Sequence, residues 1–458
     1  SQGGYTLTIS GANFDSTSSV SIGGVTAPTV GTITPTSIQV TVPSGIGQQS
    51  VVVSGDNGSS GVNNLFTYYA GGSYTAITPT RIVDTRSGAT DPATYAGKTL
   101  NSSNESLSFA VAGVGGVPSN AVGVALNVTA IAPDTSGYLS LYPSGTSPPA
   151  TSSLNFAAGS YAVANMVFCQ IGTNGSVTVA NFKGSVDVAI DVEGYVVSGS
   201  GDSFDTVSPY RAIDTRSGAN DPSTYANETF GAGQTRSFQI TGSGSPIPTS
   251  GVSTLAITLT VVNTKANGFA SVFATGTPST SPPTFSDINF SQGQTVSNTV
   301  FVPISASGSI SIYLNQSADV VVDVVGWFGS SGKDQVFLTS PVRVADSRSA
   351  SGYQDAGQTL SGVVGAPDTV TFAPTLIPTG VDGVIGNLTV TNNSTAGYLT
   401  SWSSSITLPQ VSNVNWSSPG TYANAAVIGT SSTNQSLITS NAKTDFVIDV
   451  SGFFAPTI

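Results

Sequence analysis

The residues best suited to chemistry are arginines and aspartates that recur in one short motif. The pattern Arg-x-x-Asp-[Thr/Ser]-Arg-Ser begins at Arg81, returns at Arg211 and comes a third time at Arg343. The whole chain contains only 12 Lys and Arg residues, and six of them lie in these three segments. A long, fixed period indicates an array of similar domains. The question is whether these cations hold the domains together or bind a ligand.

Aspartates also alternate with aliphatic residues near the end of each repeat. In residues 186–193, this alternation places Asp187, Ala189, Asp191 and Glu193 on one face of a strand. Paired acids suggest a glycosidase, but carboxylates four residues apart on a strand are about 13 Å apart. Retaining and inverting pairs need about 5 Å and about 6.5–9.5 Å. No partner on another strand is identifiable, so we expect no enzyme.

Ion pairs between the arginines of the opening motif and the aspartates of the closing strand would explain why both recur in every repeat. If the first and last strands of a repeat are neighbours, Arg81 or Arg86 meets Asp191, and Asp84 binds backbone N–H groups of the opening turn. Arginine suits such bidentate carboxylate contacts. We therefore predict a structural clasp, with ligand capture as the alternative, and expect its removal to destabilise the domain. Its members are Arg81, Asp84, Arg86 and Asp191; Arg211, Asp214, Arg216 and Asp323; and Arg343, Asp346, Arg348 and Asp449.

Asparagines and aromatic residues at equivalent positions of the repeats are the remaining candidates for ligand contact, here to sugars. Asparagine is depleted in strands, so each copy needs a reason. We favour buried amides that bridge to the backbone for the asparagines, and core packing for the rings. The positions are Asn155, Asn289 and Asn415; Asn165, Asn298 and Asn424; and Tyr138, Phe269 and Tyr398.

Metal and cofactor sites are not indicated. The chain has no His and one Cys, Cys169, so it has no Ser-His-Asp set, no internal disulfide and no Cys/His zinc pattern. Calcium near Asp91 and Asp221 is conceivable but unsupported by a motif. We expect no cofactor, and we expect Cys169 to be an inert core thiol, because its neighbours are apolar.

The elements that must position these residues are β-strands. The 458 residues are 38% hydrophobic but only 8% charged, and no window shows a 3.6-residue apolar period. The net charge of −12 argues against nucleic acid and anionic membranes as partners, and no apolar run reaches the length of a membrane span. This composition, without an N-terminal leader, favours a mature secreted protein at a bacterial or archaeal cell surface.

Residues 1–72 differ from the rest. A Gly-Gly followed by an alternating Thr-Leu-Thr-Ile strand and Phe14, an Ile-Gly-Gly turn, a Val-Pro pair and a final Phe-Thr-Tyr resemble the IPT/TIG immunoglobulin-like domain. The resemblance implies a small β-sandwich that serves as a spacer or interaction module on extracellular proteins. Such domains normally open with an extra strand before the Gly-Gly, and here that strand is not seen.

The last residues resemble the start of that strand. We therefore hypothesise head-to-tail assembly, in which the C-terminus of one subunit completes the first domain of the next. The residues assigned to this assembly are Tyr5, Leu7, Ile9, Ala455, Pro456, Thr457 and Ile458. The alternatives are an artificial chain boundary or an excerpt from a longer repeating polypeptide.

Three long repeats follow, at residues 73–198, 199–330 and 331–458, here called repeats 1, 2 and 3. Each has an Asp-Thr-Arg or Asp-Ser-Arg opening, an Asn-Phe or Asn-Trp centre and an Asp-Val closing strand before a Gly-aromatic pair. They resemble repeats of secreted proteins from actinobacteria and other bacteria, which implies a surface location and little about activity. Short strands with turn signals between them predict β-sandwiches.

The predicted fold is thus all-β: an N-terminal Ig-like sandwich followed by three homologous β-sandwich-like domains in tandem. The predicted function is a structural subunit of an extracellular filament, sheath or surface layer, with copies of itself as partner. The alternative is a cell-surface adhesin or carbohydrate-binding array with glycans as partner. An accessory arm of a polysaccharide hydrolase is third.

Overall fold

A computed structural model describes the chain except residues 1–3, 5, 46, 57, 62, 64, 65, 91, 102–104, 200, 220, 221, 243, 278–282, 350, 351, 354, 374, 375, 457 and 458. It divides into two compact units, Ser1–Gly71 and Gly72–Ile458. Strands dominate both, as the composition predicts, and the described helices are three single 3-10 turns: η1 (Ala93–Tyr95), η2 (Thr173–Gly175) and η3 (Ser223–Tyr225). No described helix has the length and apolar character needed to cross a bilayer.

The first unit is a small sandwich of short strands. One sheet has the order β3-β2-β6-β7, β1 pairs with β4, and β5 pairs with β8. Apolar residues that alternate along β2 and β4, among them Ile22, Ile38 and Val40, form its core. The strands are β1 (Thr6–Ser10), β2 (Ser19–Ile22), β3 (Val25–Ala27), β4 (Ser37–Thr41), β5 (Gly47–Gln49), β6 (Val51–Gly55), β7 (Gly58–Ser59) and β8 (Phe66–Tyr68).

The second unit contains the three repeats, each built from eight strands in the same order. Repeat 1 has β9 (Ala70–Asp84), β10 (Glu105–Ala110), β11 (Ala121–Ile131), β12 (Gly137–Pro143), β13 (Leu154–Phe156), β14 (Ala162–Gln170), β15 (Ser176–Asn181) and β16 (Asp187–Val197). Repeat 2 has β17 (Ser203–Asp214), β18 (Gln234–Gln239), β19 (Val252–Val262), β20 (Gly268–Ala274), β21 (Ile288–Phe290), β22 (Val296–Pro303), β23 (Ser309–Leu314) and β24 (Asp319–Gly329). Repeat 3 has β25 (Gln335–Asp346), β26 (Asp368–Thr371), β27 (Gly383–Thr391), β28 (Gly397–Ser403), β29 (Val414–Trp416), β30 (Tyr422–Gly429), β31 (Gln435–Ser440) and β32 (Asp445–Ala455).

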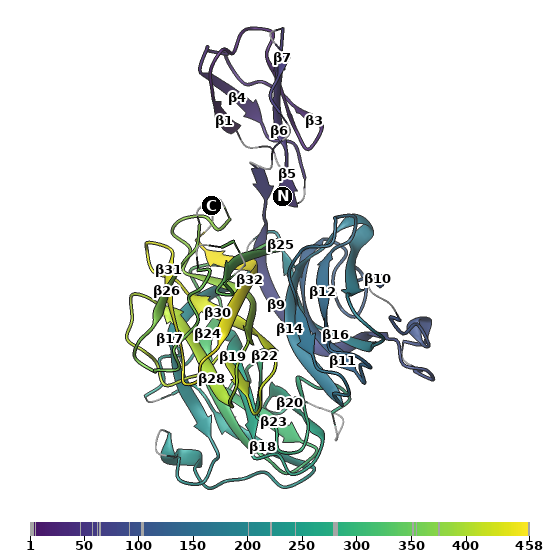
Figure 1. The fold of residues 1–458 in the computed structure, drawn as a ribbon, viewed down its shortest axis with the longest axis vertical. Coiled ribbons are helices and arrows are strands. Elements are labelled where there is room, and N and C mark those ends of the chain that lie inside the picture. Colours follow the sequence, from purple (N-terminus) through teal and green to yellow (C-terminus); the bar gives the residue numbers. More distant parts are fainter. Residues whose placement is uncertain are drawn as a thin grey trace. The chain divides into compact units, whose positions relative to one another are not determined.

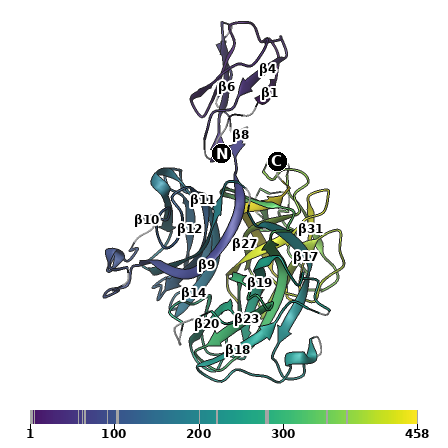
Figure 2. The ribbon, with the colours of Figure 1, turned by 180° about the vertical axis from the view of Figure 1, so that it is seen from behind.

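Each repeat folds into two facing antiparallel sheets. In repeat 1 the inner strands have the order β14-β11-β16-β9, and the outer sheet has the order β10-β15-β12-β13. The inner strands of repeats 1 and 3 join at β9 and β25 into one eight-stranded sheet, whereas those of repeat 2 form a separate sheet of four. The opening strand β9, the long curved strand in Figure 2, lies beside the closing strand β16. β17 and β24, and β25 and β32, pair in the same way. The neighbouring first and last strands required by the predicted clasp are therefore present in all three repeats.

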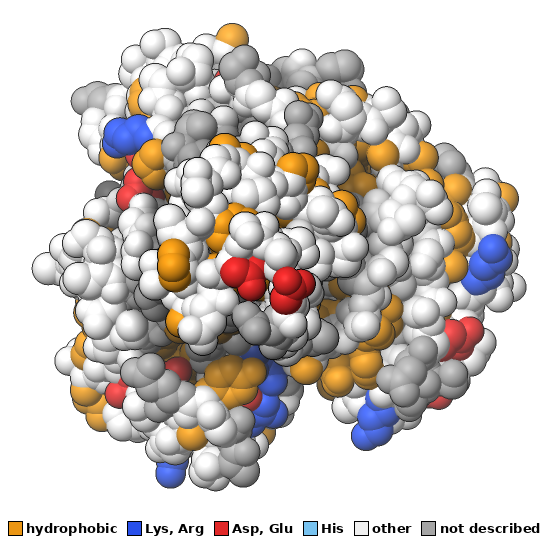
Figure 3. Space-filling view, turned by 90° about the horizontal axis from the view of Figure 1, so that it is seen from above, with side chains coloured by type: hydrophobic (Ala, Val, Ile, Leu, Met, Phe, Trp, Pro, Cys, Tyr) orange, Lys and Arg blue, Asp and Glu red, His pale blue; other side chains and the backbone are white. Residues whose placement is uncertain are grey.

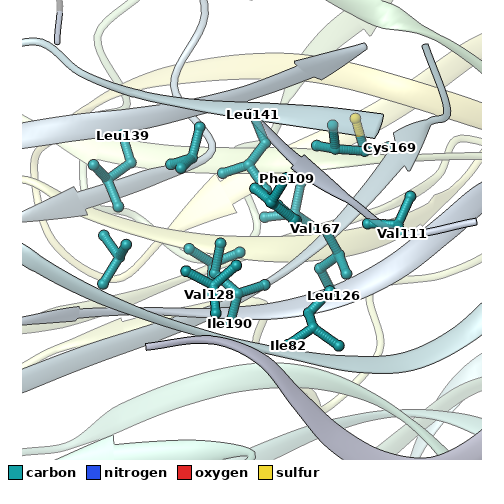
Figure 4. Close-up of a cluster of buried hydrophobic side chains, with 14 of the residues drawn as sticks. Ile82, Phe109, Val111, Leu126, Val128, Leu139, Leu141, Val167, Cys169 and Ile190 are labelled. Carbon is teal, nitrogen blue, oxygen red and sulfur yellow. The ribbon is translucent and has the colours of Figure 1, made fainter. Parts of the chain in front are cut away.

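The core of each repeat lies between its two sheets. In repeat 1, Leu139 and Leu141 of β12 meet Val128 and Ile190 of the inner sheet, as Figure 4 shows. Cys169 lies at the edge of this cluster with 1% of its surface exposed, which agrees with the inert core thiol expected from its neighbours. The far side of the inner sheet is buried as well. Every residue of the closing strands β24 and β32 is buried, because the repeats cover one another there.

The three repeats pack into one block. Strands β14, β22 and β30, the edge strands of the three inner sheets, contact one another at its centre. Figure 1 shows the repeats, coloured purple to teal, teal to green and green to yellow, around this centre. Because each repeat presents the same strand, the block has approximate threefold symmetry within one chain. The sequence repeats indicated three similar domains but not this mutual packing.

Candidate functional site

The structure brings Arg81 and Asp191 together in a bidentate ion pair. Arg81 Nε and Nη2 donate to the two carboxylate oxygens of Asp191 over 2.8 and 2.9 Å. The same geometry joins Arg211 to Asp323, at 2.8 and 3.2 Å, and Arg343 to Asp449, at 2.8 and 3.0 Å. The sequence left open which arginine of each motif pairs with the aspartate of the closing strand. The structure shows that it is the first arginine.

The second arginine of each motif binds the motif's own aspartate. Arg86 donates from its backbone N–H and from Nε to Asp84 Oδ1, and from Nη2 to Oδ2. Asp84 thus accepts a backbone N–H of the opening turn, as the sequence suggests, and also receives two arginines, since Arg81 Nη1 lies 3.4 Å away. Arg216–Asp214 and Arg348–Asp346 repeat this arrangement.

The hydroxyl between the aspartate and the second arginine ties the motif to the closing strand. Thr85 Oγ1 accepts the N–H of Val188 at 2.8 Å and donates to Asp187 Oδ1 at 3.1 Å. Ser347 makes both contacts in repeat 3, with Phe446 and Asp445. A hydroxyl both donates and accepts, which explains why only Thr or Ser fills this position.

The electrostatics of the clasp follow from this geometry. Burial alone would raise the pKa of Asp84, but the hydrogen bonds from the Arg86 side chain and backbone outweigh burial and lower it. Asp323 has no exposed surface, and burial raises its pKa against the opposing bonds from Arg211. Each clasp joins two arginines to two carboxylates and is therefore neutral as a unit.

Three asparagines form a closed hydrogen-bond ring at the centre of the block. Asn165 Oδ1 accepts the N–H of Ala425 in repeat 3 at 2.7 Å. Asn424 Oδ1 accepts the N–H of Thr299 in repeat 2 at 3.2 Å, and Asn298 Oδ1 accepts the N–H of Met166 in repeat 1 at 3.0 Å. Each repeat thus donates to one neighbour and accepts from the other.

Each of these amides also donates to the backbone of its own repeat. Asn165 Nδ2 donates to the carbonyl of Ser153 at 2.7 Å, and Asn298 and Asn424 donate to the carbonyls of Asp287 and Asn413. All three side chains are fully or almost fully buried. The prediction of buried amides that bridge to the backbone is confirmed at these positions, and the bridges join separate repeats.

The other asparagines behave differently. Asn155, Asn289 and Asn415 are only half-buried, and the bonds of Asn415 Nδ2 go to the serine side chains of Ser412 and Ser297. Backbone bridging is therefore wrong for Asn415. In contrast, Asn127 and Asn387, which the sequence analysis did not single out, are buried and donate to backbone carbonyls of a neighbouring repeat.

The aromatic residues Tyr138, Phe269 and Tyr398 are half-buried, so full core packing is wrong for them. Tyr138 stacks on Phe182 with the ring centroids 4.8 Å apart. Tyr138 and Tyr398 line clefts between repeats, of about 300 and about 510 Å³. The opposite wall of each cleft carries both clasp arginines of the adjoining repeat: Arg343 and Arg348 facing Tyr138, and Arg211 and Arg216 facing Tyr398.

Glu193 and Asp287 form a buried carboxyl pair between repeats 1 and 2. Both side chains are at most 2% exposed and line an apolar cavity of about 320 Å³. Burial raises the pKa of Glu193 well above its usual value, and Asp287 and Asp191 raise it further. Burial raises the pKa of Asp287 to about 7, against the N–H bond from Val272. The other two interfaces carry Val325 with Asn413, and Ser451 with Ser153, at these positions.

The remaining predicted residues lie apart from these contacts. Leu7 and Ile9 are half-buried against the core of the first unit. The prediction that Ala455 belongs to the donated strand is wrong. Ala455 pairs with Gln335 in β32 and is 3% exposed, so it is part of its own repeat. Tyr5, Thr457, Ile458, Asp91 and Asp221 lie outside the described residues. Across the described part of the chain, no group of three or more acidic, His or Cys side chains could hold a metal ion.

Comparison with known protein families gives a match for the N-terminal segment of the chain. Residues 1–68 match the IPT/TIG domain family, which agrees with the resemblance seen in the sequence. No curated protein matched the chain. The resemblance of repeats 1, 2 and 3 to repeats of secreted bacterial proteins therefore stays a prediction.

Three similar solved structures have low TM-scores. They include SGBP-B from the mixed-linkage glucan utilization locus of Bacteroides ovatus, in complex with a mixed-linkage heptasaccharide (14% identity, 71% of each chain, TM-score 0.16). The Sulfolobus Turreted Icosahedral Virus structure follows, with 11% identity over 87% of this chain and 93% of that chain, and a TM-score of 0.18. The triple jelly roll of an archaeal virus has 11% identity over 86% and 92%, with a TM-score of 0.16. At these scores the likeness carries no argument about function.

Proposed function

We propose that this chain is a non-catalytic structural subunit of an extracellular bacterial filament, sheath or surface layer, in which the TIG domain of one copy accepts a strand from another. The observation that carries the proposal is the outer edge of β1. Among the described residues, β1 pairs with β4 alone. An unpaired edge of a sheet offers a ladder of N–H and C=O groups to an added strand.

The register of β1 determines which groups face that edge. Gly11 N–H donates to the carbonyl of Thr36, in line with the β1–β4 pairs. Because hydrogen bonding alternates along an antiparallel pair, Leu7 and Ile9 bond to β4. The N–H and C=O groups of Thr6, Thr8 and Ser10 then point outward, where an added strand would meet them.

The side chains of β1 support the same proposal. Leu7 and Ile9 face the core but are only half-buried, whereas Ile38 and Val40 of the paired strand β4 have no exposed surface. A strand added beside β1 would cover the exposed part of Leu7 and Ile9. Burial of apolar surface is favourable by roughly 25 cal/mol per Å².

The donor must begin after Ala455. β32 holds Ala455 by pairing it with Gln335, so donation of that residue would break a completed sheet. Pro456 is exposed and follows the last residue of the strand. The donor segment in this proposal therefore runs from Pro456 onward.

The surface chemistry fits a structural role. Most arginines form clasps with aspartates within the block, and the face drawn in Figure 3 shows few charged side chains among uncharged and hydrophobic ones. Such a surface is suited to stable contact with solvent and neighbours rather than to binding nucleic acid or anionic membranes.

The test compares two substitutions at one position of β1. Thr8→Pro removes an outward N–H and leaves the backbone bonds to β4 in place, whereas Thr8→Val keeps that N–H. Both substitutions remove the bond from Gln39 Nε2 to Thr8 Oγ1, so they differ in the outward N–H. We expect fibres or higher oligomers, by negative-stain microscopy and light scattering, from the unaltered protein and from Thr8→Val. We expect none from Thr8→Pro or from a chain ending at Ala455. The proposal fails if the unaltered protein stays monomeric at all concentrations, or if Thr8→Pro assembles equally well.

A further inference from the structure

Two clefts of the three-repeat block have the same architecture. One, of about 510 Å³, lies between repeats 2 and 3, and the other, of about 300 Å³, lies between repeats 1 and 3. Both volumes fall at or within the size range of small-molecule sites. The third interface has Phe269 and Asn289 with Arg81 and Arg86 at the equivalent positions, so a phenylalanine replaces the tyrosine there.

The same four side-chain types recur in each cleft. One repeat supplies a tyrosine, an asparagine and a serine, and its neighbour supplies the two clasp arginines. In the larger cleft these are Tyr398, Asn415, Ser412, Arg211 and Arg216. In the smaller cleft they are Tyr138, Asn155, Ser152, Arg343 and Arg348. A ring that is half-buried and half-exposed at both sites is available to a ligand.

The outer arginine of each cleft has donor capacity left over. Arg216 uses its backbone N–H, Nε and Nη2 on Asp214, and no described residue makes a hydrogen bond to its Nη1 group. Its side chain is 42% exposed, and that of Arg348 is 45% exposed. The guanidinium is held in place by the carboxylate behind it, so its remaining N–H groups project in a fixed direction.

The charge of the clefts selects the class of ligand. Asp214 and Asp323 lie behind Arg211 and Arg216, so the two positive charges are already neutralised. A phosphate or carboxylate ligand would gain little from a neutral unit. An aromatic ring face instead suits a ligand with an apolar face. The side-chain amide and the N–H groups of the charge-neutralised arginines suit a ligand with many hydroxyl groups.

We infer that these two clefts each bind a segment of an uncharged polysaccharide, with one sugar ring against Tyr398 or Tyr138 and its hydroxyls on the asparagine and the outer arginine. This site is separate from the edge of β1, and its occupancy does not depend on assembly. One chain carries two such clefts, so the binding stoichiometry is two per chain.

Calorimetric titration tests this inference on the full chain. The probes are neutral hexasaccharides of glucose, mannose, xylose and galactose, with a hexamer of galacturonic acid as the charged comparison. We expect at least one neutral probe to bind at two sites per chain. Tyr398→Ala should weaken one site at least tenfold, and Tyr138→Ala with Tyr398→Ala should weaken both. Tyr398→Phe should retain binding, because phenylalanine keeps the ring face against which the sugar packs.

Tyr161→Ala is the matched control, because Tyr161 is 53% exposed and lines neither cleft. It should bind like the unaltered protein. The inference is overturned if no neutral probe binds at millimolar concentration, if the galacturonate hexamer binds more tightly than every neutral probe, or if the double tyrosine variant binds unchanged. A folded double variant, verified by its circular dichroism, keeps loss of binding distinct from loss of structure.

Discussion

Replacing Asn165 by alanine tests whether the asparagine ring couples the three repeats. The side chain has no exposed surface, and its loss removes the acceptor for Ala425 N–H and the donor to the Ser153 carbonyl. Both backbone groups stay buried, because Ala425 and Ser153 are 3% and 6% exposed. An orphaned buried polar group costs about 1–3 kcal/mol, so the variant should lose about 2–6 kcal/mol of unfolding free energy.

The tryptophans allow this loss to be assigned to coupling. The chain contains three tryptophans, Trp327, Trp402 and Trp416, and all of them lie in repeats 2 and 3. They are 2–4% exposed, so their fluorescence reports unfolding of those repeats. Asn165 lies in repeat 1. We expect Asn165→Ala to lower the urea midpoint of the tryptophan signal together with that of the circular dichroism signal.

Asn155→Ala is the matched control, because Asn155 is in the same repeat but only half-buried. The Asn155 side-chain oxygen makes no hydrogen bond to a described residue, so removing it should change the unfolding free energy by less than about 1 kcal/mol. If Asn165→Ala leaves the tryptophan midpoint unchanged and shifts only an earlier dichroism transition, the repeats unfold independently. The ring would then not couple them, and the reasoning above would be refuted.

Three further predictions concern the clasp, the acid pair and the thiol. Arg81→Ala leaves Asp191 buried and unpaired and should cost about 3–5 kcal/mol in urea denaturation, whereas Lys98→Ala at a surface site should cost less than about 1 kcal/mol; equal midpoints would contradict a stabilising clasp. Glu193→Val with Asp287→Asn copies the Val325 and Asn413 pair of the next interface. The folded pKa of Asp287 is raised to about 7 from an unfolded value of about 4, so its stabilising contribution is complete below pH 4 and is lost as the pH rises towards 7. The melting temperature of the double variant minus that of the unaltered protein should therefore increase from about pH 4 to about pH 7. A difference that stays constant over this range would contradict a buried Glu193–Asp287 pair. Burial raises the pKa of the Cys169 thiol, so it should react with a thiol reagent only after denaturation, which absorbance at native and denaturing conditions would check.

Local patterns predicted much of the fold. Alternation of apolar and polar residues, with turns between the segments, indicated strands and a sandwich class. The ion pair with Asp191 was predicted on the condition that the first and last strands of each repeat are neighbours. These features depend on residues within one repeat. The choice between Arg81 and Arg86 as partner of Asp191 stayed open, because it depends on a register shift between β9 and β16 at Ile190/Asp191.

Contacts between repeats could not be derived in the same way. The ring of Asn165, Asn298 and Asn424 joins residues more than 100 positions apart, and no periodicity reports which repeat faces which. The one available signal was asparagine at the same strand position in all three repeats, which is unusual in a strand. Glu193 carried a weaker signal: it breaks the repeat pattern, since Val325 and Ser451 replace it in the other copies.

The closed ring also constrains how the protein can be made. Repeat 1 bonds directly to repeat 3 through Asn165 and Ala425, so the block cannot close until the third repeat has been synthesised. Until then the inner sheets of repeats 1 and 2 keep one face in water, which hydrates the asparagines and carboxyls that end up buried. Closure of the block therefore depends on the presence of repeat 3, and an N-terminal fragment that ends before repeat 3 cannot complete the ring.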